Sequence, residues 1–134
     1  GAHTGYGPSG NHQQNMERAN ASVLAIAQIE TVEGVRNCDE ILSVEGLDAV
    51  IIGPCDLAIS MGEPDNVGCD EELALIDEVR DACKKHSKGF GIIGGNALLA
   101  RYANDINFMV SAIDTHILRD SFAAAVDDYR KIGE

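Results

Sequence analysis

Two stretches of this sequence are apolar almost throughout, and they constrain the fold more than any other feature. Residues 23–29 read VLAIAQI and residues 49–53 read AVIIG. Strands with one face in water alternate apolar and polar residues, whereas parallel strands covered on both faces read as nearly continuous apolar runs. The two stretches therefore predict a parallel sheet with helices packed on it.

Four such strands are expected, and a helical pattern follows each of them. In the longest helical pattern Leu73, Ile76, Val79 and Cys83 recur at helical spacing, with charged residues between them. Asn96 and Asp114 can cap the last two helices with their side chains. The strands are expected at residues 22–30, 48–53, 89–93 and 107–113, and the helices at residues 15–21, 32–42, 56–61, 70–86, 96–103 and 114–131.

The order of strands and helices indicates the α/β class and one domain over residues 1–134. An open doubly wound sheet and a (β/α)8 barrel both fit this order. A complete barrel takes about 250 residues. At 134 residues the chain supplies about half of one. The first residue is Gly1, which predicts a processed chain or a fragment.

The charge of the chain excludes two classes of partner. Asp and Glu outnumber Lys and Arg by 22 to 10, and the formal net charge is −12. Nucleic acids and anionic membrane surfaces both require basic patches. No apolar run approaches the roughly 20 residues of a membrane span. We therefore expect neither nucleic acid nor membrane as a partner.

The four cysteines do not have the spacing of a zinc site. They lie at positions 38, 55, 69 and 83, with no CxxC pair. We expect no signal peptide before them. We therefore expect the four cysteines to be free thiols and the protein to be cytoplasmic.

Polar side chains follow the two apolar stretches at the point where each strand ends. Gln28 and Glu30 are two residues apart and so share one face of their strand. Asp56 comes just after the next strand, in the sequence IIGPCDL. The carboxyl ends of parallel strands form the edge at which α/β proteins bind ligands. The sequence therefore predicts two neighbouring carboxylates at one edge of the sheet.

Two adjacent carboxylates repel each other unless a cation lies between them. Carboxylates with water ligands suit a hard ion such as Mg²⁺ or Mn²⁺. The GPCD turn offers N–H groups to an anion, so that a small keto acid could bind beside the metal. A purely structural interpretation stays open, in which Glu30 favours the N-terminus of the next helix and Asp56 caps its own helix.

Residues 26–62, IAQIETVEGVRNCDEILSVEGLDAVIIGPCDLAISMG, strongly resemble the HpcH/HpaI class II aldolases, which are metal-dependent pyruvate aldolases. The signature is Gln-Ile-Glu followed by Gly-Pro-x-Asp-Leu. GYGPSG at residues 5–10 is similar to the glycine-rich loop of that family, and residues 91–118 are similar to its last two strands. The resemblance implies four βα units of the C-terminal half of a (β/α)8 barrel.

The resemblance also implies the roles of individual residues. Glu30 and Asp56 would ligate Mg²⁺, Mn²⁺ or Co²⁺, and Gln28 would contact pyruvate. The pyruvate carboxylate would lie against three consecutive residues of the turn. They are Gly53, Pro54 and Cys55. The implied reaction is the cleavage or formation of 4-hydroxy-2-oxo acids through a pyruvate enolate.

The chain also departs from the family pattern. The catalytic histidine and the substrate-binding arginine of the family lie in its first half, and neither has a matching position here, so no catalytic residue is assigned. We expect impaired activity, and either a homo-oligomer or a separate chain that supplies the first half. The alternatives are a non-catalytic protein that binds metal and 2-oxo acids, and a citrate lyase β-like carbon–carbon lyase. A flavodoxin-like binding domain is disfavoured because ETVEG is too acidic for a phosphate loop.

Overall fold

A parallel sheet of four strands forms the centre of the molecule. The computed structural model describes residues 11–110 and 112–132, so the GYGPSG segment lies outside the described residues. The strand order is β1-β2-β3-β4, and all three neighbouring pairs are parallel. The expected α/β fold is thus confirmed. The strands are β1 (Ile26–Ile29), β2 (Ala49–Ile52), β3 (Gly89–Ile93) and β4 (Phe108–Val110).

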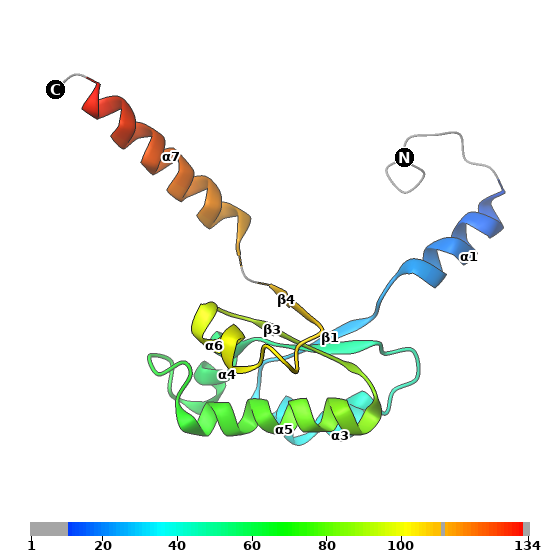
Figure 1. Cartoon of the computed structure of the whole chain (residues 1–134). Helices are drawn as coiled ribbons and strands as arrows, with labels where there is room; N and C mark the ends of the chain where they lie inside the picture. Colours follow the sequence, from blue (N-terminus) through cyan, green and yellow to red (C-terminus); the bar gives the residue numbers. More distant parts are fainter. Residues whose placement is uncertain (1–10, 111, 133–134) are drawn as a thin grey trace.

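Helices connect the strands and cover one face of the sheet (Figure 1). The long helix α5 packs against β2, β3 and the shorter helices α2, α3 and α4. No helix in residues 11–110 and 112–132 combines the length and the apolar character needed to cross a bilayer. The helices are α1 (His12–Ser22), α2 (Val32–Arg36), α3 (Cys38–Leu42), α4 (Pro54–Met61), α5 (Asp70–His86), α6 (Asn96–Arg101) and α7 (Asp114–Lys131).

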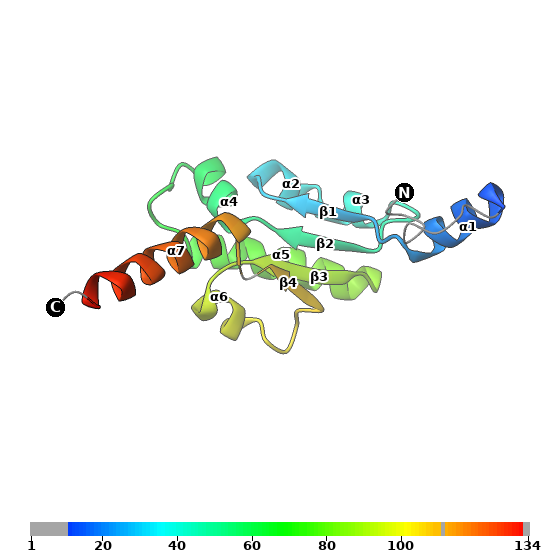
Figure 2. The ribbon, with the colours of Figure 1, turned by 90° about the horizontal axis from the view of Figure 1, so that it is seen from above.

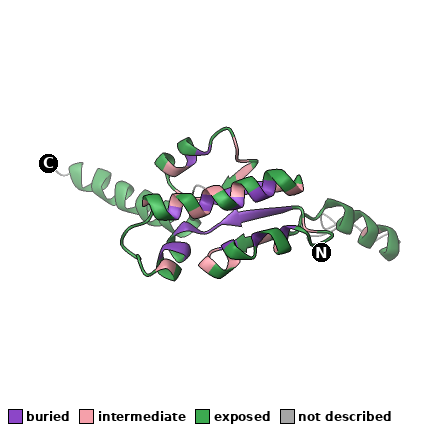
Figure 3. Cartoon of the chain, turned by 90° about the horizontal axis from the view of Figure 1, so that it is seen from below, coloured by how far each residue is buried: buried purple, intermediate pink, exposed green. Residues whose placement is uncertain are grey.

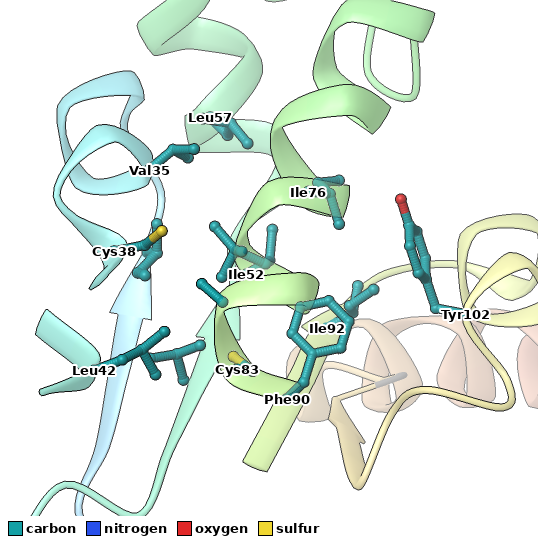
Figure 4. Packing of buried hydrophobic residues seen from close by; sticks show 14 of the residues in the cluster. Val35, Cys38, Leu42, Ile52, Leu57, Ile76, Cys83, Phe90, Ile92 and Tyr102 are labelled. Carbon is teal, nitrogen blue, oxygen red and sulfur yellow. The ribbon is translucent and has the colours of Figure 1, made fainter. Parts of the chain in front are cut away.

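The hydrophobic core lies between the sheet and the helices α2, α3, α4 and α5 (Figure 4). Alternate residues of the strands point into it, because side chains two apart in a strand share a face. Buried and exposed residues alternate along α5 at helical spacing (Figure 3), and its buried residues are Glu72, Ile76, Val79, Ala82 and Cys83. The strand residues of the core are Ile29, Val50, Ile52, Phe90 and Ile92.

The opposite face of the sheet carries no helix from the described part of the chain (Figure 2). Ile26 and Val110, on its two outer strands, are 43% and 42% exposed. On the same face the Phe108 ring of β4 lies over Gly91 of β3, where a Cβ would come 2.5 Å from the ring. The terminal helices α1 and α7 contribute no buried residue and extend away from the sheet (Figure 1).

The structure corrects three local predictions. The expected helix over 32–42 is two short helices, because Asn37 ends one and begins the other. Asn96 and Asp114 are not N-caps: each is the first residue of its helix, and the caps are Gly95 and Ile113. The expected strand over 22–30 is also shorter, since α1 continues to Ser22.

Candidate metal and keto-acid site

The carboxyl end of β1 presents an amide and a carboxylate side by side. Gln28 Nε2 donates a hydrogen bond to Glu30 Oε2. Ile29 between them is 2% exposed and points into the core, so that the two polar side chains lie toward the uncovered face. Thr31 then caps α2 by accepting a hydrogen bond from Gly34 N at 3.0 Å. The strand thus ends with Glu30 outside the helix.

Gly53 brings the end of β2 against this pair. Its N–H donates to the Ile29 carbonyl oxygen at 3.2 Å, which extends the pairing of the two strands by one residue. A Cβ on Gly53 would lie 3.0 Å from Gln28 Nε2 and 3.2 Å from Glu30 Oε2. Any larger residue would therefore push the amide and the carboxylate away from the turn.

The turn after Gly53 is the first turn of α4. Pro54 is the first helical residue, and Asp56 is the acidic residue of that turn. Pro54 is buried, whereas Cys55 and Asp56 are exposed. The N–H groups of a first helical turn have no acceptor within the helix. Those of Cys55 and Asp56 are thus suited to an anion, which the helix dipole also favours.

The donor set at this edge fits a hard divalent ion that keeps several water ligands. No group of three His, Cys, Asp or Glu side chains that could hold a metal occurs within residues 11–110 and 112–132. Magnesium, however, is usually held by one or two carboxylates, with waters or substrate oxygens completing the shell. Glu30 and Asp56 can supply two carboxylates, because Glu30 follows β1 and Asp56 lies in the first turn of α4, at the carboxyl ends of two neighbouring strands. The assignment of both as ligands stays a prediction.

The structure contradicts one of the two structural interpretations of the acids. Glu30 directly precedes Thr31, the N-cap of α2, which agrees with its expected place near the N-terminus of that helix. Asp56, in contrast, is not an N-cap, since the cap of α4 is Gly53. A favourable interaction of both carboxylates with the helix dipole remains compatible with their positions.

Sequence reasoning missed a cavity beside this turn. It has a volume of 540 Å³ and is lined by Pro54 and Cys55, by the carboxyl end of β3 and by Arg101 of α6. A Cβ on Gly94 would lie 3.0 Å from Leu98 Cδ2, so Gly94 permits close packing of α6 against the end of β3. Gly95 has open space around it and faces the cavity. The glycine pair after β3 was the available signal for this hollow.

No histidine is paired with the candidate site residues in the described part of the chain. His86 Nε2 lies 2.7 Å from Asp39 Oδ1, on the helical side of the molecule. His12 is exposed on α1. His116 lines a smaller hollow of 350 Å³ at the ends of β3 and β4.

Comparisons with known proteins agree on one family. The family model described as HpcH/HpaI aldolase/citrate lyase matches residues 8–113. A hydroxypyruvate/pyruvate aldolase from Rhizorhabdus wittichii is 35% identical over 121 residues, which are 87% of this chain and 48% of that protein. A 2-keto-3-deoxy-L-rhamnonate aldolase from Salmonella paratyphi B is 30% identical over 119 residues, or 87% of this chain and 45% of that protein. The chain thus spans about half the length of the curated relatives that it matches.

Solved structures show the same likeness in three dimensions. The HpcH/HpaI aldolase from Desulfitobacterium hafniense DCB-2 has a TM-score of 0.77 at 25% identity, with 95% of this chain and 50% of that chain covered. The citrate lyase beta subunit from M. tuberculosis, solved with oxaloacetate and magnesium, has a TM-score of 0.56 at 16% identity, with 75% and 51% covered. The latter likeness concerns the fold alone.

Proposed function

Because the chain belongs to the HpcH/HpaI aldolase/citrate lyase family, we propose that it serves divalent-metal-dependent carbon–carbon lyase chemistry on 4-hydroxy-2-oxo acids. The observation that carries the proposal is the contact around Gly53, which joins the Gln28–Glu30 pair to the turn that bears Asp56. Glu30 and Asp56 hold the ion, which is Mg²⁺, Mn²⁺ or Co²⁺. When bound, that ion stabilises negative charge that develops on the keto oxygen.

The chain's own residues bind and orient the keto acid. The N–H groups of Cys55 and Asp56 receive its carboxylate at the start of α4, beside Gly53 and Pro54. Gln28 uses one N–H to orient Glu30, and its remaining polar atoms contact the keto acid. Pyruvate and related small 2-oxo acids fit these contacts.

Cleavage requires a base that removes the proton of the 4-hydroxyl group. The bond between carbons 3 and 4 then breaks, an aldehyde leaves, and the electron pair remains on pyruvate as its enolate, which takes a proton at carbon 3. No described histidine pairs with the candidate site. We therefore propose slow turnover by the 134-residue chain itself, since a missing general base typically costs about 10²- to 10⁴-fold.

The uncovered sheet face supports the proposal of a protein partner. Ile26 and Val110 are exposed on that face, and β1 and β4 are each paired on one side only. Unpaired strand edges promote association. A second copy of this chain, or a separate chain that completes a barrel, would cover the exposed sheet face and pair with the free edges of β1 and β4. Sedimentation equilibrium at micromolar concentration tests this, and a monomer mass for the chain alone would count against the homo-oligomer.

Pyruvate release from 4-hydroxy-2-oxo acids tests the function. We expect release in the presence of Mn²⁺, its loss in EDTA, and its loss in Glu30→Gln and Asp56→Asn. Glu33→Gln is the matched control, because Glu33 is an exposed carboxylate in the first turn of α2 and is not one of the proposed site residues. Release that persists in EDTA, or equally in all variants, would contradict the proposal.

One observation favours a second candidate, a protein that binds metal and 2-oxo acids without turnover. Within residues 11–110 and 112–132, no histidine or arginine donates a hydrogen bond to Gln28, Glu30 or Asp56. Mn²⁺ binding that is lost in Glu30→Gln and Asp56→Asn, with no pyruvate release by the parent chain, would favour this candidate.

A further inference from the structure

The 540 Å³ cavity has walls from three parts of the chain. Figure 2 shows α4 and α6 at the same end of the sheet, where β2 and β3 finish. Val67 and Leu73 form one wall, and Ile93 and Leu98 form another. Pockets for small organic ligands have about 300–1,000 Å³ and mainly apolar walls. The cavity thus has the size and lining of a ligand site.

The charge of the lining is opposite to that of the whole chain. The chain has 22 acidic residues and a net charge of −12, yet no Asp or Glu lines this cavity. Its charged residue is Arg101, and Asn96 adds an amide. Such a lining disfavours cations and neutral polar ligands. It favours an apolar body that carries one negative group.

The Arg101 guanidinium is held in place by contacts within the chain. Arg101 Nη2 lies 3.3 Å from Asp77 Oδ2, and its guanidinium carbon lies 5.6 Å from the centre of the Tyr102 ring. The neighbouring Tyr102 side chain raises the pKa of Arg101. Arginine has five N–H donors in a planar fork, so one contact with Asp77 leaves donors for a carboxylate.

A buried carboxylate fixes the loop wall of the cavity. Gly68, which lines the cavity, has a φ of +86° and donates its N–H to Glu72 Oε2. Glu72 is fully buried, and its Oε1 has no hydrogen-bond partner in the described part of the chain. A carboxylate is costly to bury unless it makes such contacts. We interpret Glu72 as a positioning residue for the wall.

We propose that this cavity binds a small monocarboxylate with an apolar body, with its carboxylate on Arg101 and its aliphatic part between Val67, Leu73 and Leu98. The cavity adjoins the proposed keto-acid site without including its candidate metal ligands, because Gln28, Glu30 and Asp56 do not line it. The two sites meet at Pro54 and Cys55, so a ligand in the cavity contacts the turn that carries Asp56.

Titration of the ¹⁵N-labelled chain with hexanoate, followed by NMR in EDTA, tests the proposal. We expect saturable shifts at the amides of Gly94, Gly95 and Asn96. Hexanamide has the same shape without the charge and should bind about tenfold more weakly, because a charge-assisted hydrogen bond is lost. Arg101→Gln should weaken hexanoate binding by a similar factor and leave hexanamide unchanged.

Two alanines of α6 provide a matched pair of variants. Ala97 lines the cavity and Ala100 does not, and both are exposed. Ala97→Trp should abolish the shifts, whereas Ala100→Trp should bind as the parent does. The amide spectra of the two variants without ligand show whether each retains the fold of the parent chain.

Three results would overturn the proposal. The first is equal affinity for hexanoate and hexanamide. The second is unchanged binding in Ala97→Trp. The third is shifts at the cavity amides that follow protein concentration instead of ligand, which would assign the cavity to a second copy. Because the titration contains no metal, its failure leaves the proposed lyase function untouched.

Discussion

The Gln28 side-chain amide donates a hydrogen bond to the Glu30 carboxylate, two residues further along the chain at the end of β1. The contact exists because Ile29 turns into the core and leaves both neighbours on the other face. A residue that hydrogen-bonds to a metal-binding carboxylate fixes the orientation of that carboxylate. Loss of such a residue typically weakens metal binding 10- to 100-fold.

Gln28→Leu tests this orienting role. The variant removes the amide and should weaken Mn²⁺ binding about tenfold. Its unfolding free energy should change by less than about 1.5 kcal/mol, since Gln28 is exposed and loses one hydrogen bond. Isothermal titration and urea unfolding measure the two quantities. Unchanged Mn²⁺ affinity would contradict the role.

Gly53→Ala should damage the site more than the fold. Its Cβ would come 3.0 Å from Gln28 Nε2 and 3.2 Å from Glu30 Oε2, and both side chains can move away. We expect a loss of Mn²⁺ affinity of about tenfold or more. Gly62→Ala is the control: Gly62 has a φ of +85° and no atom within 4 Å of its Cβ. That change should lower stability by about 1 kcal/mol and keep Mn²⁺ affinity.

Thiol reactivity should separate the cysteines by their burial. Cys55 is exposed, whereas burial raises the pKa of Cys83 to about 12 and also raises that of Cys38. Only the thiolate reacts with iodoacetamide. At pH 8 we therefore expect alkylation of Cys55 well before Cys38 and Cys83, as read by peptide mass spectrometry. Equal rates in the native chain would contradict the buried positions.

The ion pair at Asp39 should stabilise the fold only above acidic pH. Hydrogen bonds from Lys85 and then from His86 lower the pKa of Asp39. A lowered folded pKa gives stability that is present above the unfolded value, about 4, and is lost as pH falls through the folded value. Asp39→Asn should thus melt below the parent chain at pH 6 and together with it near pH 2. Glu40→Gln, on the same helix, is the control. A difference that persists at pH 2 would exclude this explanation.

Gly91 and Phe108 should depend on each other. A Cβ on Gly91 would lie 2.5 Å from the Phe108 ring, so that Gly91→Ala must displace it at a cost of about 1–3 kcal/mol. In the background of Phe108→Ala the same change should cost much less. A double-mutant cycle of unfolding free energies measures the coupling. Additive effects would show that the ring does not pack on Gly91.

The sequence predicted the sheet and its polar edge because both depend on local pattern. The apolar runs identified the buried strands, and the two-residue spacing placed Gln28 and Glu30 on one face. The sequence did not predict the contact of Gly53 with the Gln28 and Glu30 side chains. That contact depends on the register of the two strands, in which Ile29 pairs with Ile52. The Arg101 cavity was missed for a similar reason, since its walls come from segments distant in sequence. The starts of α6 and α7 at Asn96 and Asp114 were predicted correctly, but the N-caps were not, because the preceding residues, Gly95 and Ile113, have extended backbones and take the cap position.

The central claim is that Glu30 and Asp56 share one divalent ion, and paramagnetic broadening by Mn²⁺ tests it most directly. A bound Mn²⁺ broadens the amide signals of nearby residues. We expect the amide signals of residues 30–31 and of residues 53 and 55–57 to broaden together at substoichiometric Mn²⁺, and both sets to remain sharp in Glu30→Gln and in Asp56→Asn. Broadening of one set without the other in the parent chain, or broadening that survives either substitution, would contradict the account.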